Sequence, residues 1–125
     1  MISYFDTSFV VKLYVLEHGT TEAKAAVAVA SVVATSRVVY AEAIAAFARK
    51  LRKREFTSKT YRQVWEDLRR DWNSYFLVEV TQQLVVLAGE LARRRGLRGF
   101  DAVHLASAIL LRRRAKAPSL SFQPI

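Results

Sequence analysis

Short apolar runs alternate with helical patterns along this sequence of 125 residues, and this alternation constrains the fold more than any other feature. Four runs rich in apolar, β-branched or aromatic residues predict strands at residues 2–5, 31–35, 75–80 and 120–122. Helical spacing of apolar residues fills most of the chain between them. Strands that alternate with helices predict an α/β fold with a short, mainly parallel sheet and helices on both faces.

The stretches between the runs also carry the capping residues of helices. We expect Thr7 or Ser8 to cap the first helix, Thr57 or Ser58 to cap the fourth and Thr81 to cap the fifth, which should end at Gly96. The expected helices cover residues 9–15, about 22–30, 38–51, 59–72, 82–95 and 101–114, with a loop at 98–100. Apolar stripes on the third and fourth helices predict that these two pack as a hairpin.

Composition indicates one globular domain over residues 1–125. Hydrophobic residues make up 52% of the chain, which has only two prolines and four glycines, so a disordered or linker-dominated protein is excluded. The absence of cysteine excludes disulfide scaffolds, zinc ribbons and thiol nucleophiles, and it fits a reducing compartment such as the cytoplasm. We expect no secretion signal and no membrane segment, because no apolar run approaches ~18 residues.

The net charge of +9 is concentrated in two segments. Residues 37–62 hold eight basic residues against two acidic ones, and residues 93–116 hold eight against one. Concentrated positive charge suits a polyanion such as RNA or DNA, or an acidic protein partner. The structural alternative is a set of solvated, arginine-rich helix faces.

Three acidic residues occupy positions that a parallel sheet would bring together. Asp6 follows the first predicted strand, Glu42 lies early in the helix after the second, and Asp101 begins a helix after a glycine-containing loop. Ligands of such sheets bind beyond the carboxyl ends of the strands, so we expect the three acids to converge on one edge. Favourable interaction with the helix dipole is the structural alternative for Glu42 and Asp101.

Carboxylates that converge in this way need a counter-charge. They would repel one another and raise their pKa values unless a divalent cation neutralised them. A hard, oxygen-preferring ion, Mg²⁺ or Mn²⁺, is therefore the predicted cofactor, with Asp6, Glu42 and Asp101 as its ligands.

Three segments resemble a known family. They read FDTSFVVKLY at residues 5–14, YAE at 40–42 and GLRGFDAVHLA at 96–106. In this order and separation they resemble PIN-domain ribonucleases, especially the VapC-type toxins of prokaryotic toxin–antitoxin pairs. The resemblance implies a compact α/β fold, a carboxylate cluster holding Mg²⁺ or Mn²⁺, endonucleolytic cleavage of RNA and a bound antitoxin that blocks the site.

Carried over by position, the resemblance makes Asp6, Glu42 and Asp101 the catalytic acids and Ser8 their hydroxyl companion. From its position alone, Ser8 either orders a water molecule at the metal or caps its helix. His104 lies on a mostly apolar helix three residues after Asp101, and we favour a packed or capping histidine over an acid–base role.

The predicted partners follow from the same reasoning. We expect Arg49, Arg93, Arg94 and Arg98 to guide the RNA backbone toward the acidic centre. The other predicted partner is an acidic antitoxin protein, and the sequence leaves a homodimer open.

One position departs from the family pattern. The family usually has a further acid after the last strand, followed by a C-terminal helix, whereas this sequence has Gln123 there and ends two residues later. An amide supplies no charge, so we expect a second metal to bind less well or not at all. The second hypothesis is therefore a catalytically weak or inactive PIN-like module that binds RNA or an antitoxin. A third, a helical DNA-binding regulator, explains the charge but not the acids.

Overall fold

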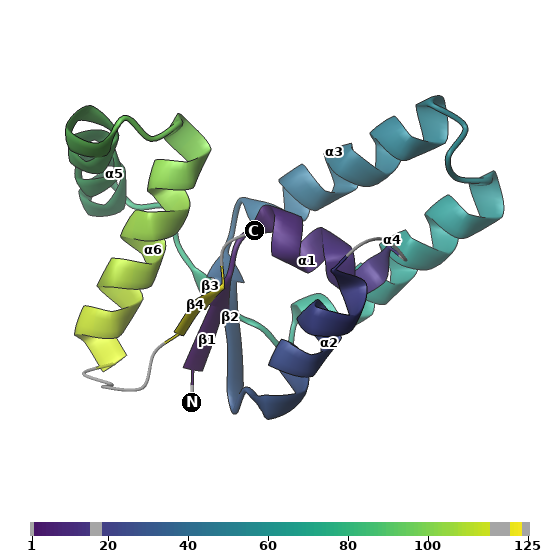
Figure 1. The fold of residues 1–125 in the computed structure, drawn as a ribbon, viewed down its shortest axis with the longest axis horizontal. Helices are drawn as coiled ribbons and strands as arrows, with labels where there is room; N and C mark the ends of the chain where they lie inside the picture. Colours follow the sequence, from purple (N-terminus) through teal and green to yellow (C-terminus); the bar gives the residue numbers. More distant parts are fainter. Residues whose placement is uncertain (1, 16–18, 116–120, 124–125) are drawn as a thin grey trace.

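A computed structural model describes residues 2–15, 19–115 and 121–123, with Ala115 and residues 121–123 described by their backbone alone. The described elements form one sheet with helices packed on both of its faces (Figure 1). In chain order they are β1 (Ile2–Phe5), α1 (Thr7–Tyr14), α2 (Thr20–Val29), β2 (Val32–Ser36), α3 (Val39–Arg52), α4 (Ser58–Trp72), β3 (Phe76–Val78), α5 (Gln82–Arg95), α6 (Gly99–Ala115) and β4 (Ser121–Gln123).

All the described strand pairs are parallel, and the strand order is β3-β2-β1-β4. Tyr4 pairs with Ala34 of β2, and Phe5 pairs with Gln123 of β4. The predicted parallel sheet is therefore confirmed, although Leu120 of the fourth predicted strand lies outside the described residues. A parallel sheet also makes the helical DNA-binding regulator the wrong fold class.

The two faces of the sheet bury separate hydrophobic clusters. Successive residues of a strand point to opposite faces, so Phe5 packs with α1–α4 while Tyr4 packs with α5 and α6 (Figure 1). Phe47 and Leu68 are fully buried in the first cluster, and Leu84 is fully buried in the second. Burial on both faces is typical of parallel sheets.

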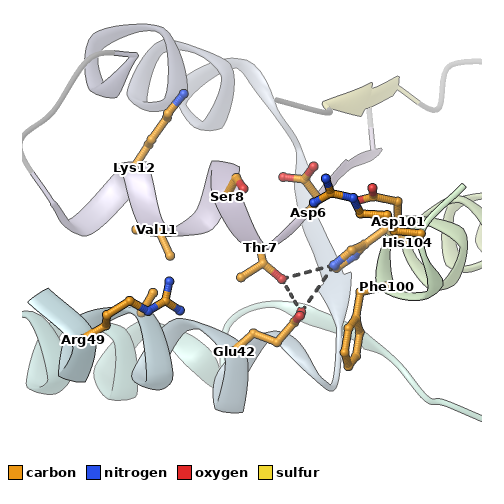
Figure 2. Close-up of a pocket in the computed structure, with 12 residues that line it drawn as sticks. Asp6, Thr7, Ser8, Val11, Lys12, Glu42, Arg49, Phe100, Asp101 and His104 are labelled. Carbon is orange, nitrogen blue, oxygen red and sulfur yellow. Dashed lines mark hydrogen bonds and ion pairs between the residues drawn. The ribbon is translucent and has the colours of Figure 1, made fainter.

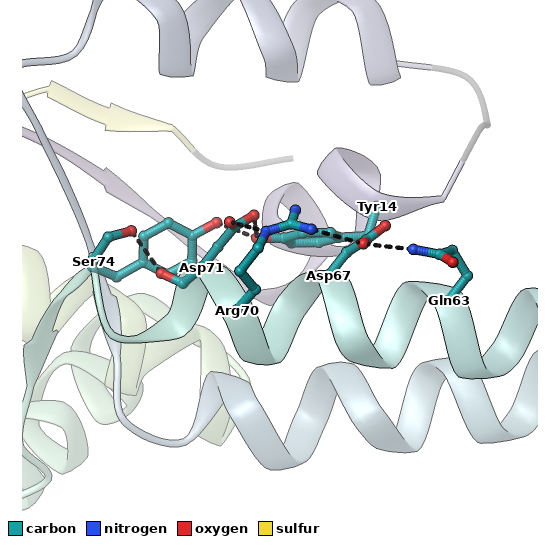
Figure 3. Close-up of polar contacts among 7 residues, drawn as sticks. Tyr14, Gln63, Asp67, Arg70, Asp71 and Ser74 are labelled. Atoms are coloured by element: carbon teal, nitrogen blue, oxygen red, sulfur yellow. Dashed lines mark hydrogen bonds and ion pairs between the residues drawn. The ribbon is translucent and has the colours of Figure 1, made fainter.

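The α3–α4 hairpin is tied to α1 by polar contacts at the end of α4 (Figure 3). The Tyr14 hydroxyl donates to Asp71 Oδ2 at 2.9 Å and is also hydrogen-bonded to the Tyr75 hydroxyl. Burial raises the pKa of Tyr14, so this hydroxyl keeps its proton. Arg70 bridges Asp67 and Asp71, at 3.2 Å from each. The contacts of Tyr14 hold the end of α4 against α1.

Several predicted helix boundaries are confirmed. Thr57 and Thr81 cap α4 and α5 through their side chains, and Gly96 ends α5 in the left-handed conformation with φ 66°. Two boundaries are wrong. The cap of α1 is Asp6 and not Thr7 or Ser8, and α6 already begins at Gly99, inside the loop expected at 98–100. The Ala102 N–H bonds to the Arg98 carbonyl at 2.9 Å, which closes the first turn earlier than predicted.

None of the helices within the described residues combines the length and the apolar character that crossing a membrane requires.

Candidate active site

A pocket of about 630 Å³ opens beyond the carboxyl end of β1. Its walls come from α1, from α3 and from the start of α6 (Figure 2). It lies where parallel α/β sheets place their ligand sites, in the crevice beyond the carboxyl ends of the strands.

The three acids predicted from the sequence all line this pocket. Asp6 directly follows β1, and its Oδ1 accepts a hydrogen bond from the Phe9 N–H at 3.0 Å. Glu42 lies in the first turn of α3, and Asp101 lies in the first turn of α6. The expected common edge is therefore confirmed, and the helix dipoles favour both carboxylates there as well.

A hydrogen-bond network links all three pocket walls through Thr7 and His104. The imidazole is only 4% exposed. Its Nδ1 lies 2.8 Å from the Tyr4 hydroxyl, and its Nε2 lies 3.1 Å from Thr7 Oγ1 and 3.5 Å from Glu42 Oε1. The Thr7 hydroxyl donates to the same Glu42 oxygen (Figure 2). His104 is thus the packed histidine that the sequence analysis favours.

The partners of His104 fix where its proton lies in the neutral ring. Because Thr7 gives its single hydroxyl proton to Glu42, its oxygen is left to accept from Nε2–H of His104. Nδ1 then accepts from the Tyr4 hydroxyl, which burial keeps protonated by raising the pKa of Tyr4. Protons therefore point in one direction along the network, from Tyr4 toward Glu42.

The network also sets the charge of Glu42. Burial alone would raise the pKa of this carboxyl, but hydrogen bonds from His104 and Thr7, with the attraction of His104, outweigh burial and lower it. Glu42 is therefore ionised at neutral pH and held in one orientation.

The acids do not form a compact metal cluster. Within residues 2–15, 19–115 and 121–123, no group of three or more His, Cys, Asp or Glu side chains is placed to hold a metal ion. The three acids thus share one pocket without forming such a group, and the Glu42 carboxylate is instead hydrogen-bonded to Thr7 and lies near His104. Mg²⁺ needs only one or two carboxylates and keeps several water molecules, so Asp6 and Asp101 supply donors that fit it.

Cationic side chains surround the acidic pocket. Lys12, Arg49 and Arg98 line it. Arg93 and Arg94 instead lie exposed in the last turn of α5, where both contact Glu90 and neither lines this pocket. The structure therefore brings two of the four predicted RNA-binding arginines to the site.

Two further residues named in the sequence analysis, Ser8 and Gln123, lie near the site. Ser8 is exposed, lines the pocket and is a residue of α1 rather than its cap. Gln123 pairs with Phe5, which immediately precedes Asp6. The backbone of Gln123 therefore lies at the same edge of the sheet as Asp6.

Thr7, Lys12 and Phe100 are pocket residues that the sequence reasoning missed. The sequence does contain a signal for the hydrogen-bond network of His104. A tyrosine in a buried strand needs a partner for its hydroxyl, and a histidine on an apolar helix needs one for its ring. For Lys12 and Phe100 the sequence contains no such signal, apart from their place inside the segments that resemble the family.

Fold and pocket together define an α/β domain with an acidic, cation-rimmed site at the carboxyl edge of a parallel sheet. The PIN domain family matches residues 3–117, and this chain belongs to that family.

Curated relatives and solved structures agree with this assignment. The chain is 39% identical to "Ribonuclease VapC45" of Mycobacterium tuberculosis over 110 residues, which cover 85% of this chain and 74% of the relative. A toxin–antitoxin complex from Klebsiella pneumoniae superposes with a TM-score of 0.68 at 23% identity, covering 88% of this chain and 80% of that one. M. tuberculosis VapC20, a sarcin–ricin loop cleaving toxin, superposes with a TM-score of 0.65 at 22% identity, covering 97% and 89%. At these identities the two structures support the fold.

Proposed function

We propose that this protein is a divalent-metal-dependent endoribonuclease, the toxin of a toxin–antitoxin pair, which hydrolyses phosphodiester bonds in RNA. The observation that carries the proposal is that Asp6, Glu42 and Asp101, distant in the sequence, line one cation-rimmed pocket. The 39% identity to a ribonuclease of the VapC type supports the same reaction. An acidic antitoxin as partner and the cytoplasm as location belong to this proposal.

Each group of the pocket has a role in such a reaction. Asp6 and Asp101 would hold Mg²⁺ or Mn²⁺, with Glu42 close by and Ser8 as a neutral oxygen donor. When bound, the cation offsets the charge that grows on the phosphate and makes water more acidic. Glu42, ionised and held by Thr7 and His104, is oriented to accept a proton.

The pocket rim supplies the charge that RNA requires. Arg49 and Arg98 attract phosphates on either side of a centre that would otherwise repel them. The pocket has room for a nucleotide between these side chains, at about 630 Å³.

The substitution Asp6→Asn tests the proposal. It removes a carboxylate charge but keeps an oxygen acceptor for the Phe9 N–H, and asparagine caps helices about as well as aspartate. We expect an unchanged melting temperature and a loss of Mg²⁺-stimulated RNA cleavage. Asp67→Asn makes the same change on α4, outside the pocket, and should cleave normally. Undiminished cleavage by folded Asp6→Asn protein would contradict the proposal.

Gln123 favours a second candidate function, a weak or inactive PIN module that binds RNA or an antitoxin. Its backbone lies beside the end of β1, where a fourth carboxylate would add charge to the site. We predict that Gln123→Asp tightens Mn²⁺ binding and raises cleavage, because affinity for hard cations rises with ligand charge. Calorimetric titration and cleavage assays measure both, with Asp101→Asn as the control that should bind the ion poorly. Equal affinity and rate in Gln123→Asp and the parent would place residue 123 outside the metal site.

A further inference from the structure

Phe100 has no evident structural role in either hydrophobic cluster. It is the second residue of α6, directly before Asp101, and 56% of its surface is exposed. It is absent from both clusters that the described residues form, yet it lines the acidic pocket. A large aromatic ring is thus held at the mouth of a site whose other lining residues are mostly polar or charged.

The same ring also lines a second hollow, an apolar groove of about 340 Å³ between α5 and α6. Val85 and Val103 line this groove with Phe100, and Val85 is 47% exposed. At Gly89 in the groove, a Cβ atom would meet no other atom within 4 Å, so the floor there is open. Phe100 therefore lies between the acidic pocket and the apolar groove, and it lines both.

The charge near the apolar groove indicates which kind of molecule binds there. Arg98 lines the acidic pocket together with Phe100, and Arg95 is exposed in the last turn of α5, where Glu90 pairs with Arg93 and Arg94. Two copies of the chain joined across this groove by a two-fold axis would bring like charges together, which is unfavourable. A nucleotide satisfies both parts of the surface, because its phosphate attracts the arginines and its base is apolar on both faces.

We propose that Phe100 is a stacking platform for an unpaired nucleobase adjacent to the phosphate held in the acidic pocket. The inference rests on the proposed function for the identity of the ligand. Stacking the base fixes the position of the neighbouring phosphate relative to Asp101, so Phe100 is a positioning residue for the substrate and discriminates between a base that is free to stack and one that is paired.

The test uses single-stranded oligoribonucleotides that carry the fluorescent base 2-aminopurine at successive positions. They are bound with Mg²⁺ to the Asp6→Asn protein, in which cleavage is expected to be silenced. We expect the fluorescence to be quenched at one position, where the base stacks. Adding Phe100→Ala should abolish that quenching and weaken binding roughly fivefold to a hundredfold, the range for loss of one base–aromatic stack. Phe100→Trp should restore both, because indole also stacks.

Phe76→Ala is the matched control, since Phe76 is also exposed, at 43%, but lies in the edge strand β3 and does not line the pocket. It should leave quenching and affinity unchanged. Unchanged quenching and affinity in Phe100→Ala overturn the proposal, as does a change confined to oligomeric state in sedimentation, which would make the groove a self-association surface. If Asp6→Asn still cleaves RNA while the Phe100-dependent quenching is present, stacking stands and the proposed metal chemistry falls.

Discussion

The Thr7 hydroxyl is the smallest group on which the geometry of the pocket depends. It donates to Glu42 and lies within hydrogen-bond distance of His104, so one oxygen joins α1, α3 and α6. A residue that contacts two other elements in this way transmits a small change in its side chain to the charge and the orientation of the carboxylate beside it.

We predict that Thr7→Val raises the pKa of Glu42 and lowers cleavage. Valine has nearly the shape of threonine but cannot donate, and the hydrogen bond from Thr7 is one of the interactions that lower this pKa. The acid limb of the pH–rate profile should move to higher pH. Thr7→Ser retains the hydroxyl and should leave the limb near its original position. If the limb moves equally in both variants, the hydroxyl does not control Glu42.

The same shift links Glu42 to stability. A carboxyl whose pKa is lower in the folded protein stabilises the fold at pH values above its unfolded pKa, and this contribution disappears as the pH falls through the folded value. We therefore predict that the melting temperatures of the parent and of Glu42→Gln converge as the pH is lowered below about 4.5, the ordinary value for this group. Thermal melts from pH 7 to pH 3 measure this. A gap that stays constant across the range would show that ionisation of Glu42 contributes nothing.

For single residues, the sequence predicts which side chains carry charge better than it predicts which side chains contact one another. Asp6, Glu42 and Asp101 are recognisable because each follows a strand or begins a helix, and the topology then brings them to one pocket. The bond between Tyr4 and His104 depends on the packing of β1 against α6, which no local pattern encodes. Placement of the Glu42 carboxylate against Thr7 is missed for the same reason.

Helix ends show the same division at the scale of elements. The ends of α4 and α5 are set by local hydrogen bonds of Thr57, Thr81 and Gly96, which is why the sequence predicts them correctly. The start of α1 is missed because Asp6 was assigned only to the site, whereas its carboxylate also caps the helix. A residue with two roles is predicted by only one of them.

Alanine substitutions at two glycines of α5 and its C-terminal end should change the stability of the protein in opposite directions. Gly96 has φ 66° with no atom near its missing Cβ, so Gly96→Ala meets only backbone strain and should destabilise by about 1 kcal/mol. Gly89 lies inside α5, also in open space, so Gly89→Ala should stabilise by about 0.5–1 kcal/mol through helix propensity. Urea denaturation of both variants gives the two signs. Destabilisation by Gly89→Ala would mean that the groove tolerates no side chain there.

The fold places some of the arginines in the pocket and others away from it. Arg49 and Arg98 line the pocket, Arg93 and Arg94 pair with Glu90 at the end of α5, and Arg112 lies exposed in the last turn of α6, the end of that helix away from Asp101. The sequence gives the two basic segments but not this division, because it depends on which end of each helix reaches the sheet edge.

We predict a graded effect of arginine removal on RNA binding. The double variant Arg49→Gln and Arg98→Gln should weaken affinity most and reduce the salt dependence, with the log–log slope falling by roughly 0.7 for each lost phosphate contact. Arg93→Gln with Arg94→Gln should have a smaller effect, because both cations are partly neutralised by Glu90. Arg112→Gln with Arg113→Gln is the control at the far end of α6. Equal losses in all three pairs, measured by fluorescence anisotropy at several salt concentrations, would indicate attraction by net charge alone.

The position of β1 between β2 and β4 has a consequence for when the protein becomes active. β1 is synthesised before α6, and its Tyr4 hydroxyl finds its partner in His104, 100 residues later. Asp6 and Asp101 likewise come together only after α6 has been made, because α6 forms one of the three walls of the pocket. On the ribosome, the acids of a growing chain therefore stay apart until the residues of α6 have been made. Under the proposed function, the messenger RNA being translated is spared until α6 has folded back onto β1.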